Sequence, residues 1–357
     1  MAARRGVPLL LISALFAVGL LFQACSTGSS SSGSKGATAT TTALTASPVS
    51  ANPSGAESTP VMAAGPVTSA ASPGAPQNAR LVPAQANIST VGQLPLNPDT
   101  AKLPSNQYLA DQIKLGLQIV LDTPKNAPKY VGGDMSCANC HLNAGQKDKA
   151  FPWVGIAAMF PEYSGRSGAL RSLEDRIRGC FQRSENGTAP PYDSKELRAV
   201  AAYITWISAG QPMGETPPWR HQNTIPTAAR IPIEKLDPKQ GSQLYNQKCA
   251  ACHGQDGQGV QLGNVKPGPL WGNGSWNDGA GAGRVYTLAG FIRYAMPYSD
   301  PGSLSDEEAQ QIAAYIDSRD RPVFQNKQSD WPNGDVPSDA VYYPQVFPNG
   351  NPLRANR

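Results

Sequence analysis

The sequence of 357 residues has no block of basic residues, although its formal net charge is +4 at pH 7. A nucleic-acid partner therefore has no support, because such partners are bound through clustered Lys and Arg. Histidine is also scarce, since the chain holds only three. Aromatic residues are missing from Ser26 to Asn97, a stretch rich in Ser, Thr, Ala and Pro. Such a segment cannot bury enough apolar surface to offset the entropy of ordering it, so we expect a flexible tether over residues 26–98.

The first 25 residues have the pattern of an export signal. Arg4 and Arg5 precede an apolar run that ends in Leu21-Phe22-Gln23-Ala24-Cys25. A charged start, an apolar middle and a small residue before a cut site are typical of a secretory signal peptide. Cys25 after Ala24 is similar to a bacterial lipoprotein processing site, where the new N-terminal cysteine receives lipid. Ordinary cleavage and an uncleaved N-terminal membrane helix are the alternatives.

This pattern leads us to expect a periplasmic protein that contacts the membrane through a lipid anchor. The residue after Cys25 is Ser26 and not aspartate. By analogy with bacterial lipoproteins, serine there favours the outer membrane over the periplasmic face of the inner membrane.

Four of the six cysteines lie in two copies of C-x-x-C-H, Cys137-Ala138-Asn139-Cys140-His141 and Cys249-Ala250-Ala251-Cys252-His253. This motif is the attachment signature of c-type haem: both thiols bond to the porphyrin edge, and the histidine reaches the iron from the proximal side. Two copies in one exported chain are a strong signal and predict two covalently bound haem c groups. With Cys25 assigned to the anchor, Cys180 is the one thiol left without a role.

From Asp99 onward the sequence follows the same plan twice. Apolar residues at helical spacing predict a helix over Asn106–Leu121 before the first motif, and a shorter one over Pro238–Lys248 before the second. Cap-like patterns at Asp193-Ser194-Lys195-Glu196 and Ser305-Asp306-Glu307-Glu308 predict a last helix in each half. Loops rich in Gly and Pro separate each motif from its last helix.

The predicted fold class is all-α, with two class I cytochrome c-like domains in tandem, each around one covalently bound haem c. The first domain is expected over residues 99–228 and the second over 229–322. Covalent haem supplies much of each core, so domains of about 100 residues are adequate. Residues 323–357 are expected to form an irregular C-terminal strap that packs over a domain.

Each iron needs a second axial ligand or an open position. In the second half the candidate is Met296, in Tyr294-Ala295-Met296-Pro297 just before the last helix, where class I cytochromes present their thioether sulfur. In the first half the matching place holds Cys180 and no methionine. A core methionine and a buried apolar cysteine are the alternatives for these two positions. The rival ligands of the first iron are Met135, Met159, Met213 and His221.

A thiolate at the first iron would change its chemistry. Nearby Arg176, Arg178 and Arg183 favour the thiolate form of Cys180, because positive charge lowers the pKa of a thiol. Thiolate is anionic and strongly donating, so it stabilises ferric iron and lowers the reduction potential. This ligand suits sulfur chemistry on an anion better than it suits a simple electron carrier.

At these residues the chain resembles the dihaem thiosulfate dehydrogenases, also called tetrathionate reductases. The resemblance covers Gln107 to about Arg319. It implies that the cysteine at Cys180 ligates the first, catalytic haem, and that Arg166 and Arg176 line the substrate site. It rests on these strings: Val131-Gly132-Gly133, Phe160-Pro161-Glu162-Tyr163, Arg166-Ser167-Gly168, Leu173-Glu174-Asp175-Arg176-Ile177, Cys180-Phe181, Arg183-Ser184, Gly187, Pro191-Tyr192-Asp193-Ser194, Gly268–Gly272 and Met296-Pro297.

The resemblance implies an enzyme that joins two thiosulfates into tetrathionate, in a reaction that one site can run in both directions. Electrons would pass from the His141/Cys180 haem to the His253/Met296 haem, and then to an external cytochrome c or high-potential iron–sulfur protein. One alternative is a non-catalytic, membrane-tethered dihaem electron carrier with two methionine-ligated irons. Another is a dihaem peroxidase-like enzyme, for which His221 would be the spare histidine.

Overall fold

The computed structural model describes residues 94–343 except residue 264, and every structural statement below concerns that part of the chain. The predicted signal peptide with Cys25, and nearly all of the predicted tether, lie outside the described residues. Within the described residues no helix is both long enough and apolar enough to cross a membrane.

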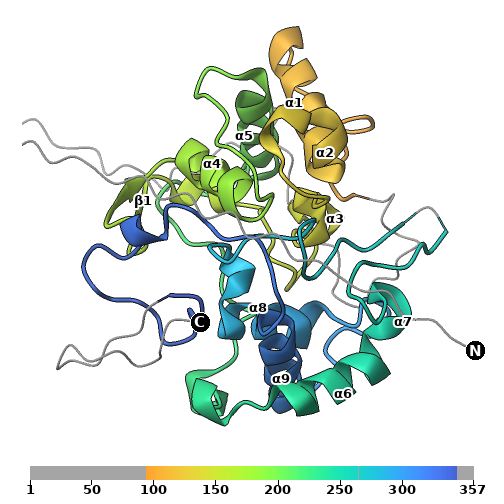
Figure 1. Ribbon diagram of the computed structural model, residues 1–357. Helices are drawn as coiled ribbons and strands as arrows, with labels where there is room; N and C mark the ends of the chain where they lie inside the picture. The colour runs from red at the N-terminus through yellow and green to blue at the C-terminus, as the bar shows by residue number, and fades with distance from the viewer. Residues whose placement is uncertain (1–93, 264, 344–357) are drawn as a thin grey trace, which may run out of the picture. The chain divides into compact units, whose positions relative to one another are not determined.

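Helices make up most of the regular structure (Figure 1). The first half holds α1 (Gln107–Leu121), α2 (Thr123–Asn126), α3 (Leu142–Gly145), α4 (Leu173–Arg183) and α5 (Lys195–Ile207). The second half holds α6 (Pro238–Lys248), α7 (Ala250–His253), α8 (Val285–Ala295) and α9 (Asp306–Asp317). Two short strands, β1 (Glu162–Ser164) and β2 (Ala169–Arg171), lie between α3 and α4.

The four predicted helices are confirmed. The Asn106 side chain accepts a hydrogen bond from the Leu109 amide at the start of α1, and α6 has the predicted bounds. At α9, Ser305 and Glu308 form the reciprocal bonds of a capping box. At α5 only the Ser194 half of the cap is present. Caps are local interactions, so the patterns at Ser194 and Ser305 mark the starts of α5 and α9.

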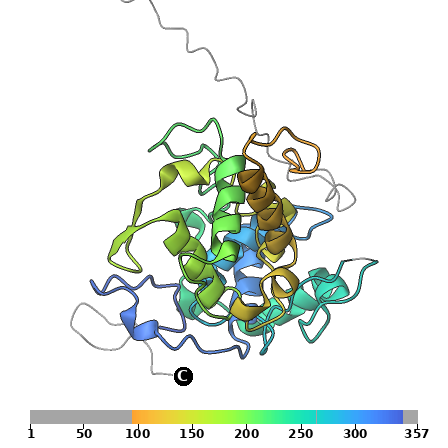
Figure 2. The same cartoon turned by 90° about the horizontal axis from the view of Figure 1, so that it is seen from above.

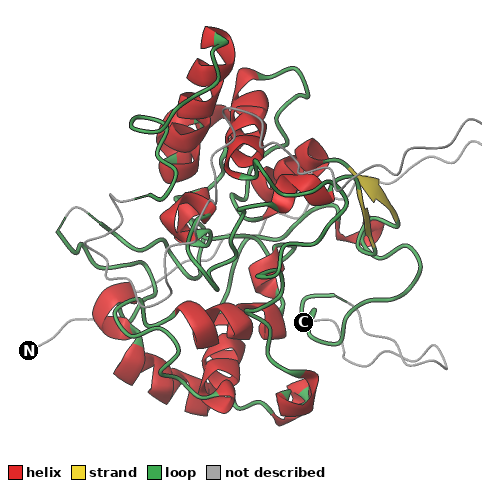
Figure 3. Ribbon diagram, turned by 180° about the vertical axis from the view of Figure 1, so that it is seen from behind, coloured by secondary structure: helices red, strands yellow, loops and turns green. Residues whose placement is uncertain are grey.

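The all-α prediction is wrong in one detail, because β1 and β2 pair as an antiparallel hairpin (Figure 3). Glu162 lies opposite Arg171, and Ser164 lies opposite Ala169. Gly168, which has φ +62°, helps to close the turn, a conformation that suits glycine. The hairpin is too short to show strand periodicity in the sequence, and its turn carries Arg166.

Two further helices, α4 and α8, occupy stretches that were expected to be Gly- and Pro-rich loops. In α4, Ser172 and Asp175 form a capping box, and Leu173, Ile177 and Phe181 are buried along one face. The charged residues between these positions hide the helical period in the sequence. This buried row of α4 faces the core shared with α1 and α5.

Each half contains one close helix crossing: α1 packs on α5, and α6 packs on α9. Figure 2 shows α1 and α5 side by side. A Cβ added at Gly116 would lie 2.1 Å from the Ala199 carbonyl oxygen, and one added at Gly241 would lie 2.0 Å from the Gln311 carbonyl oxygen. In both halves a glycine therefore lets the first and last helices approach closely.

The two halves have separate cores that meet at the first C-x-x-C-H motif. One core gathers residues of α1, α4 and α5, and the other gathers residues of α6, α8 and α9. Met135 belongs to the second core, and Cys140 packs against it. The first motif therefore lies against the second half of the chain. The domain bounds given by the sequence stay a prediction.

The C-terminal strap is described up to Tyr343 and is irregular, with one helical turn at Lys327–Ser329. It crosses both halves, because Trp331 donates its amide hydrogen to the Arg166 carbonyl while Val285 donates to the Asp339 carbonyl. The strap thus connects the start of α8 with the hairpin turn.

Substitution Gly116→Ala tests the crossing of α1 and α5. Alanine in a helix normally gains about 1 kcal/mol over glycine, but here the added methyl group collides with backbone. We expect the free energy of unfolding to fall by about 2 kcal/mol, the usual cost of overpacking. Urea unfolding followed by circular dichroism measures it. The matched control is Gly281→Ala, since the added Cβ meets nothing within 4 Å there; equal effects of the two substitutions would contradict the crossing.

Candidate haem sites

The first C-x-x-C-H motif presents its histidine in the form that a metal needs. Residues Cys137–Asn139 form a tight turn, and the His141 amide donates to the Cys137 carbonyl at 2.9 Å. The His141 Nδ1 atom lies 2.6 Å from the Phe151 carbonyl oxygen. Only a protonated Nδ1 can make this bond, so Nε2 keeps its lone pair for iron. Burial lowers the pKa of His141 to about 4, which keeps the ring neutral.

The second motif is organised in the same way around α7. Cys249 caps this helix, His253 ends it, and the Tyr245 hydroxyl donates to the Gly254 carbonyl at 2.7 Å. Burial lowers the pKa of His253 to about 4, and its Nδ1 atom has no hydrogen-bond partner among the described residues.

The residues of both motifs fit covalent haem. All five cysteines within residues 94–343 are free thiols. Cys137 and Cys140, like Cys249, are therefore available for thioether bonds, and each motif has a neutral histidine beside them.

Helix α4 brings Cys180 to the first motif. Because its Leu173–Ile177–Phe181 row is buried, the neighbouring row that contains Arg176 and Cys180 is turned toward the motif. The pKa of the Cys140 thiol rises to about 12, first through burial, then through the charge of Glu185, and then through that of Cys180. The pKa of Cys137 is raised by the same three causes. The structure thus gathers three thiols, and the ligation of iron by Cys180 stays a prediction.

The rival ligands lie in other surroundings. Met213 is 75% exposed, and Met135 is 4% exposed within the second core. The Met159 sulfur lies 3.5 Å from Arg220 Nη1, and the same guanidinium lies 3.3 Å from the His221 ring. No described interaction joins Met159, Met213 or His221 to Cys137, Cys140 or Cys180, which favours Cys180 over these three. Met135 remains a rival, because Cys140 packs against the core that contains it.

The two predicted substrate arginines differ in their surroundings. Arg166 is partly buried in the hairpin turn, where burial lowers its pKa to about 10, and it donates from Nη1 to the Gly279 carbonyl. Arg176 is exposed and has no side-chain hydrogen bond or ion pair within the described part of the chain. Its charge lowers the pKa of His141 and of Arg166, so it lies near both. Arg176 is therefore a free cation beside the first motif.

Glu185 is a site residue that the sequence did not reveal. It is 3% exposed, and its Oε2 atom has no hydrogen-bond partner in the described region. Burial raises its pKa to about 8, so the carboxyl is mostly protonated at neutral pH. Its backbone amide bonds to the Cys180 carbonyl at 3.1 Å, and its carbonyl accepts from Gly132 at 2.9 Å. No local pattern marks it, since only tertiary structure buries this carboxyl.

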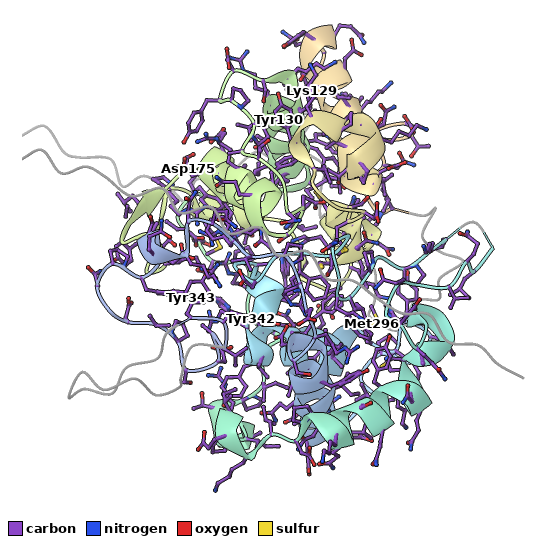
Figure 4. The ribbon with its side chains drawn as sticks, in the orientation of Figure 1. Lys129, Tyr130, Asp175, Met296, Tyr342 and Tyr343 are labelled. Carbon is purple, nitrogen blue, oxygen red and sulfur yellow. The ribbon has the colours of Figure 1, made fainter. Side chains whose placement is uncertain are left out.

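The candidate ligand Met296 follows α8 directly (Figure 4). It packs against a small cluster that contains Leu142 and Phe291. Phe151, whose carbonyl orients His141, stacks on Phe291 with 5.2 Å between ring centroids and an interplanar angle of 13°. The loop whose Phe151 orients His141 therefore packs on α8, the helix that Met296 follows.

Two family descriptions match the chain, one in each half. "SoxA/TsdA, cytochrome c domain" matches residues 129–213, and "Cytochrome C oxidase, cbb3-type, subunit III" matches residues 236–316. Together with the paired C-x-x-C-H motifs, they define a protein with two cytochrome c domains. Such domains imply covalently bound haem c.

Curated relatives narrow this class. A thiosulfate dehydrogenase of Stutzerimonas stutzeri (strain A1501) is 42% identical over 227 residues, covering 63% of this chain and 72% of the relative. One of Allochromatium vinosum (strain ATCC 17899 / DSM 180 / NBRC 103801 / NCIMB 10441 / D) is 40% identical over 239 residues, covering 65% and 86%. The chain therefore belongs to the thiosulfate dehydrogenase family, and it is a cytochrome-type enzyme.

A solved structure agrees with this assignment. Thiosulfate dehydrogenase (TsdBA) from Marichromatium purpuratum, in its "as isolated" form, matches with a TM-score of 0.60 and 30% identity. The match covers 70% of this chain, and it spans 55% of the length of that one.

The buried carboxyl of Glu185 predicts a pH dependence of stability. Its pKa is about 8 in the folded protein against 4.5 for an ordinary glutamate, so folding favours the protonated form. The contribution to stability is complete below about pH 4.5 and is lost as the pH rises through about 8. Wild type should therefore lose stability relative to Glu185→Gln between pH 5 and pH 9, measured as the urea midpoint of both proteins. The urea midpoint of Glu307→Gln, at an exposed site on α9, should change with pH in parallel with that of wild type. A Glu185→Gln midpoint that also changes in parallel with wild type would refute the raised pKa of Glu185.

Proposed function

We propose that this enzyme oxidises thiosulfate to tetrathionate in the periplasm, at a site formed by Cys180 beside the first haem motif. The observation that carries the proposal is the convergence of Cys180 with Cys137 and Cys140, next to the unpaired cation of Arg176. Membership of the thiosulfate dehydrogenase family supports the substrate. A lipid anchor at Cys25 is part of the proposal, with the outer membrane as the favoured location.

The protein residues have distinct tasks in this proposal. Cys137, Cys140 and His141, together with Cys180, would hold the first haem. Cys249, Cys252 and His253, together with Met296, would hold the second. When bound, the two haems supply one-electron acceptors for the two electrons of the reaction, which leave from the first through the second to an external cytochrome c or high-potential iron–sulfur protein.

Arg166 and Arg176 bind the sulfonate ends of the substrates. Arginine suits this task because its planar guanidinium can donate two parallel hydrogen bonds to two oxygens of one oxyanion. Arg176 has no competing partner within the described residues.

Cys180 carries the covalent chemistry. Its thiolate sulfur forms a bond with the terminal sulfur of one thiosulfate, and two electrons leave as this sulfur–sulfur bond forms. The terminal sulfur of a second thiosulfate then attacks the substrate sulfur of the adduct. The bond to Cys180 breaks, the thiolate is restored, and tetrathionate departs with the new sulfur–sulfur bond. Charge balances in both steps without any proton transfer.

Replacing Cys180 tests the proposed function. Cys180→Ala should leave both haems attached, because the thioether cysteines are untouched, and should lower thiosulfate-dependent reduction of an external acceptor at least a thousandfold. The matched control is Met159→Leu, which removes a rival sulfur and should keep wild-type turnover. A Cys180→Ala protein that retains most of its activity would refute this role.

The non-catalytic alternative, a membrane-tethered dihaem electron carrier, differs in a measurable way. A carrier would show two methionine-ligated irons and no reduction of its haems by thiosulfate. The enzyme should show one methionine-ligated iron, and thiosulfate should reduce its haems.

Replacing Met296 tests the ligand of the second haem. Met296→Leu should abolish the weak ferric absorption band near the red end of the visible spectrum, which reports a methionine sulfur on iron. Met135→Leu is the matched control, since Met135 is buried in the second core and leucine of similar volume costs less than about 1.5 kcal/mol. If Met296→Leu keeps the band, or if Met135→Leu loses it, the assignment is wrong.

A further inference from the structure

The C-terminal strap touches the proposed substrate site at the hairpin turn. Figure 1 shows the strap, in blue, beside β1. The strap lies outside the residues that either family description matches. Its Trp331 amide donates to the Arg166 carbonyl at 2.7 Å, and the Arg166 guanidinium carbon lies 4.6 Å from the centroid of the Trp331 ring. One strap residue therefore holds both the backbone and the side chain of Arg166.

The neighbouring strap residue, Asp330, organises the charges around Arg166. Its carboxylate accepts two hydrogen bonds from Arg183, at 2.8 and 2.7 Å, and one from the Tyr343 hydroxyl at 2.6 Å. The Arg166 Nη1 atom lies 3.9 Å from the same carboxylate. The Asp330 side chain is 5% exposed, so this arrangement is shielded from water and its geometry is fixed. Figure 4 shows Tyr343 on the strap.

The arrangement leaves part of Arg166 unused. Only Nη1 of its guanidinium has a hydrogen-bond partner among the described residues, the Gly279 carbonyl. Arg183, in contrast, makes two hydrogen bonds to Asp330, donates to the Gly279 carbonyl at 3.2 Å and lies over the Phe324 ring at 3.9 Å. Arg166 is thus the arginine of this pair that has fewer partners among the described residues and more donors left for a ligand.

The charges also favour an anion. The charges of Arg176 and Arg183 both lower the pKa of Arg166, and the charge of Asp330 raises it. Asp175, one of the two acidic residues of α4, accepts instead from Ser172 and Tyr192. The excess positive charge beside the first motif matches a ligand with two negative charges.

We propose that Asp330 and Trp331 are positioning residues for the substrate: they hold Arg166 so that its free donors, together with Arg176, bind a sulfonate of thiosulfate. The inference rests on the proposed function and extends it to the strap. Asp330 keeps Arg183 and Arg166 side by side despite their like charges, and Trp331 fixes the plane of the Arg166 guanidinium. Neither residue touches the reacting sulfur atoms.

A purely mechanical role of the strap is the competing explanation, and the chain offers a matched control for it. Asp339 lies on the same strap and is buried as well. It accepts two hydrogen bonds from Arg284, at 3.1 and 2.8 Å, and one from the Tyr286 amide at 3.1 Å. Asp330 and Asp339 thus make similar bonds, but only Asp330 lies beside a proposed substrate residue.

The experiment measures thiosulfate binding in the haem-loaded Cys180→Ala protein, which binds substrate without turning it over. Isothermal titration with thiosulfate compares this parent with versions that also carry Asp330→Asn or Asp339→Asn. We expect Asp330→Asn to raise the dissociation constant about tenfold and Asp339→Asn to change it less than twofold. With Cys180 present, Asp330→Asn should raise KM and leave kcat within about twofold. Equal changes from the two substitutions would overturn the proposal.

Trp331 supplies a second, independent pair of variants. Trp331→Leu removes the aromatic face and should weaken binding, whereas Trp331→Phe keeps it and should restore most of the affinity; equal affinities of the two would also overturn the proposal. These outcomes are separate from the test of the proposed function. Unchanged binding in Asp330→Asn, with turnover still dependent on Cys180, overturns the positioning role alone. A wild-type protein that neither binds nor oxidises thiosulfate overturns both.

Discussion

The approach of α4 to the first C-x-x-C-H motif is the constraint on which the rest of the site depends. The buried row of Leu173, Ile177 and Phe181 fixes the rotation of this helix against α1 and α5. That rotation turns Cys180 and Arg176 toward the motif. A single hydrophobic contact surface therefore sets the positions of the sulfur and of a cation, and the close crossing at Gly116 keeps the surface compact.

Phe151 links the surroundings of the first haem motif to α8 in the second half of the chain. Phe151 orients His141 through its carbonyl and stacks on Phe291 of α8 through its ring. Met296 follows the same helix. The ligand-bearing elements of the two motifs are therefore packed against each other, and the C-terminal strap crosses both halves from Asp339 to Trp331.

Sequence patterns predicted what depends on local order: the haem motifs, the four helices that flank them, and the caps at Ser194 and Ser305. They missed α4 and α8 as helices, and in α4 charged residues obscure the helical period. They also missed the hairpin around Arg166, because its three-residue strands are too short to show a period. Glu185 and Asp330 were out of reach for a different reason. Their importance comes from burial and from partners far away in the sequence, such as Arg183 for Asp330, and no local pattern encodes such partners.

The central claim is that the thiolate of Cys180 ligates the first iron. Low-temperature electron paramagnetic resonance of the fully oxidised protein tests it most directly. The account predicts a low-spin ferric signal with the narrow spread of g values that a histidine and a thiolate produce, and the loss of that signal in Cys180→Ala. Two signals of the histidine–methionine type, unchanged by this substitution, would contradict it.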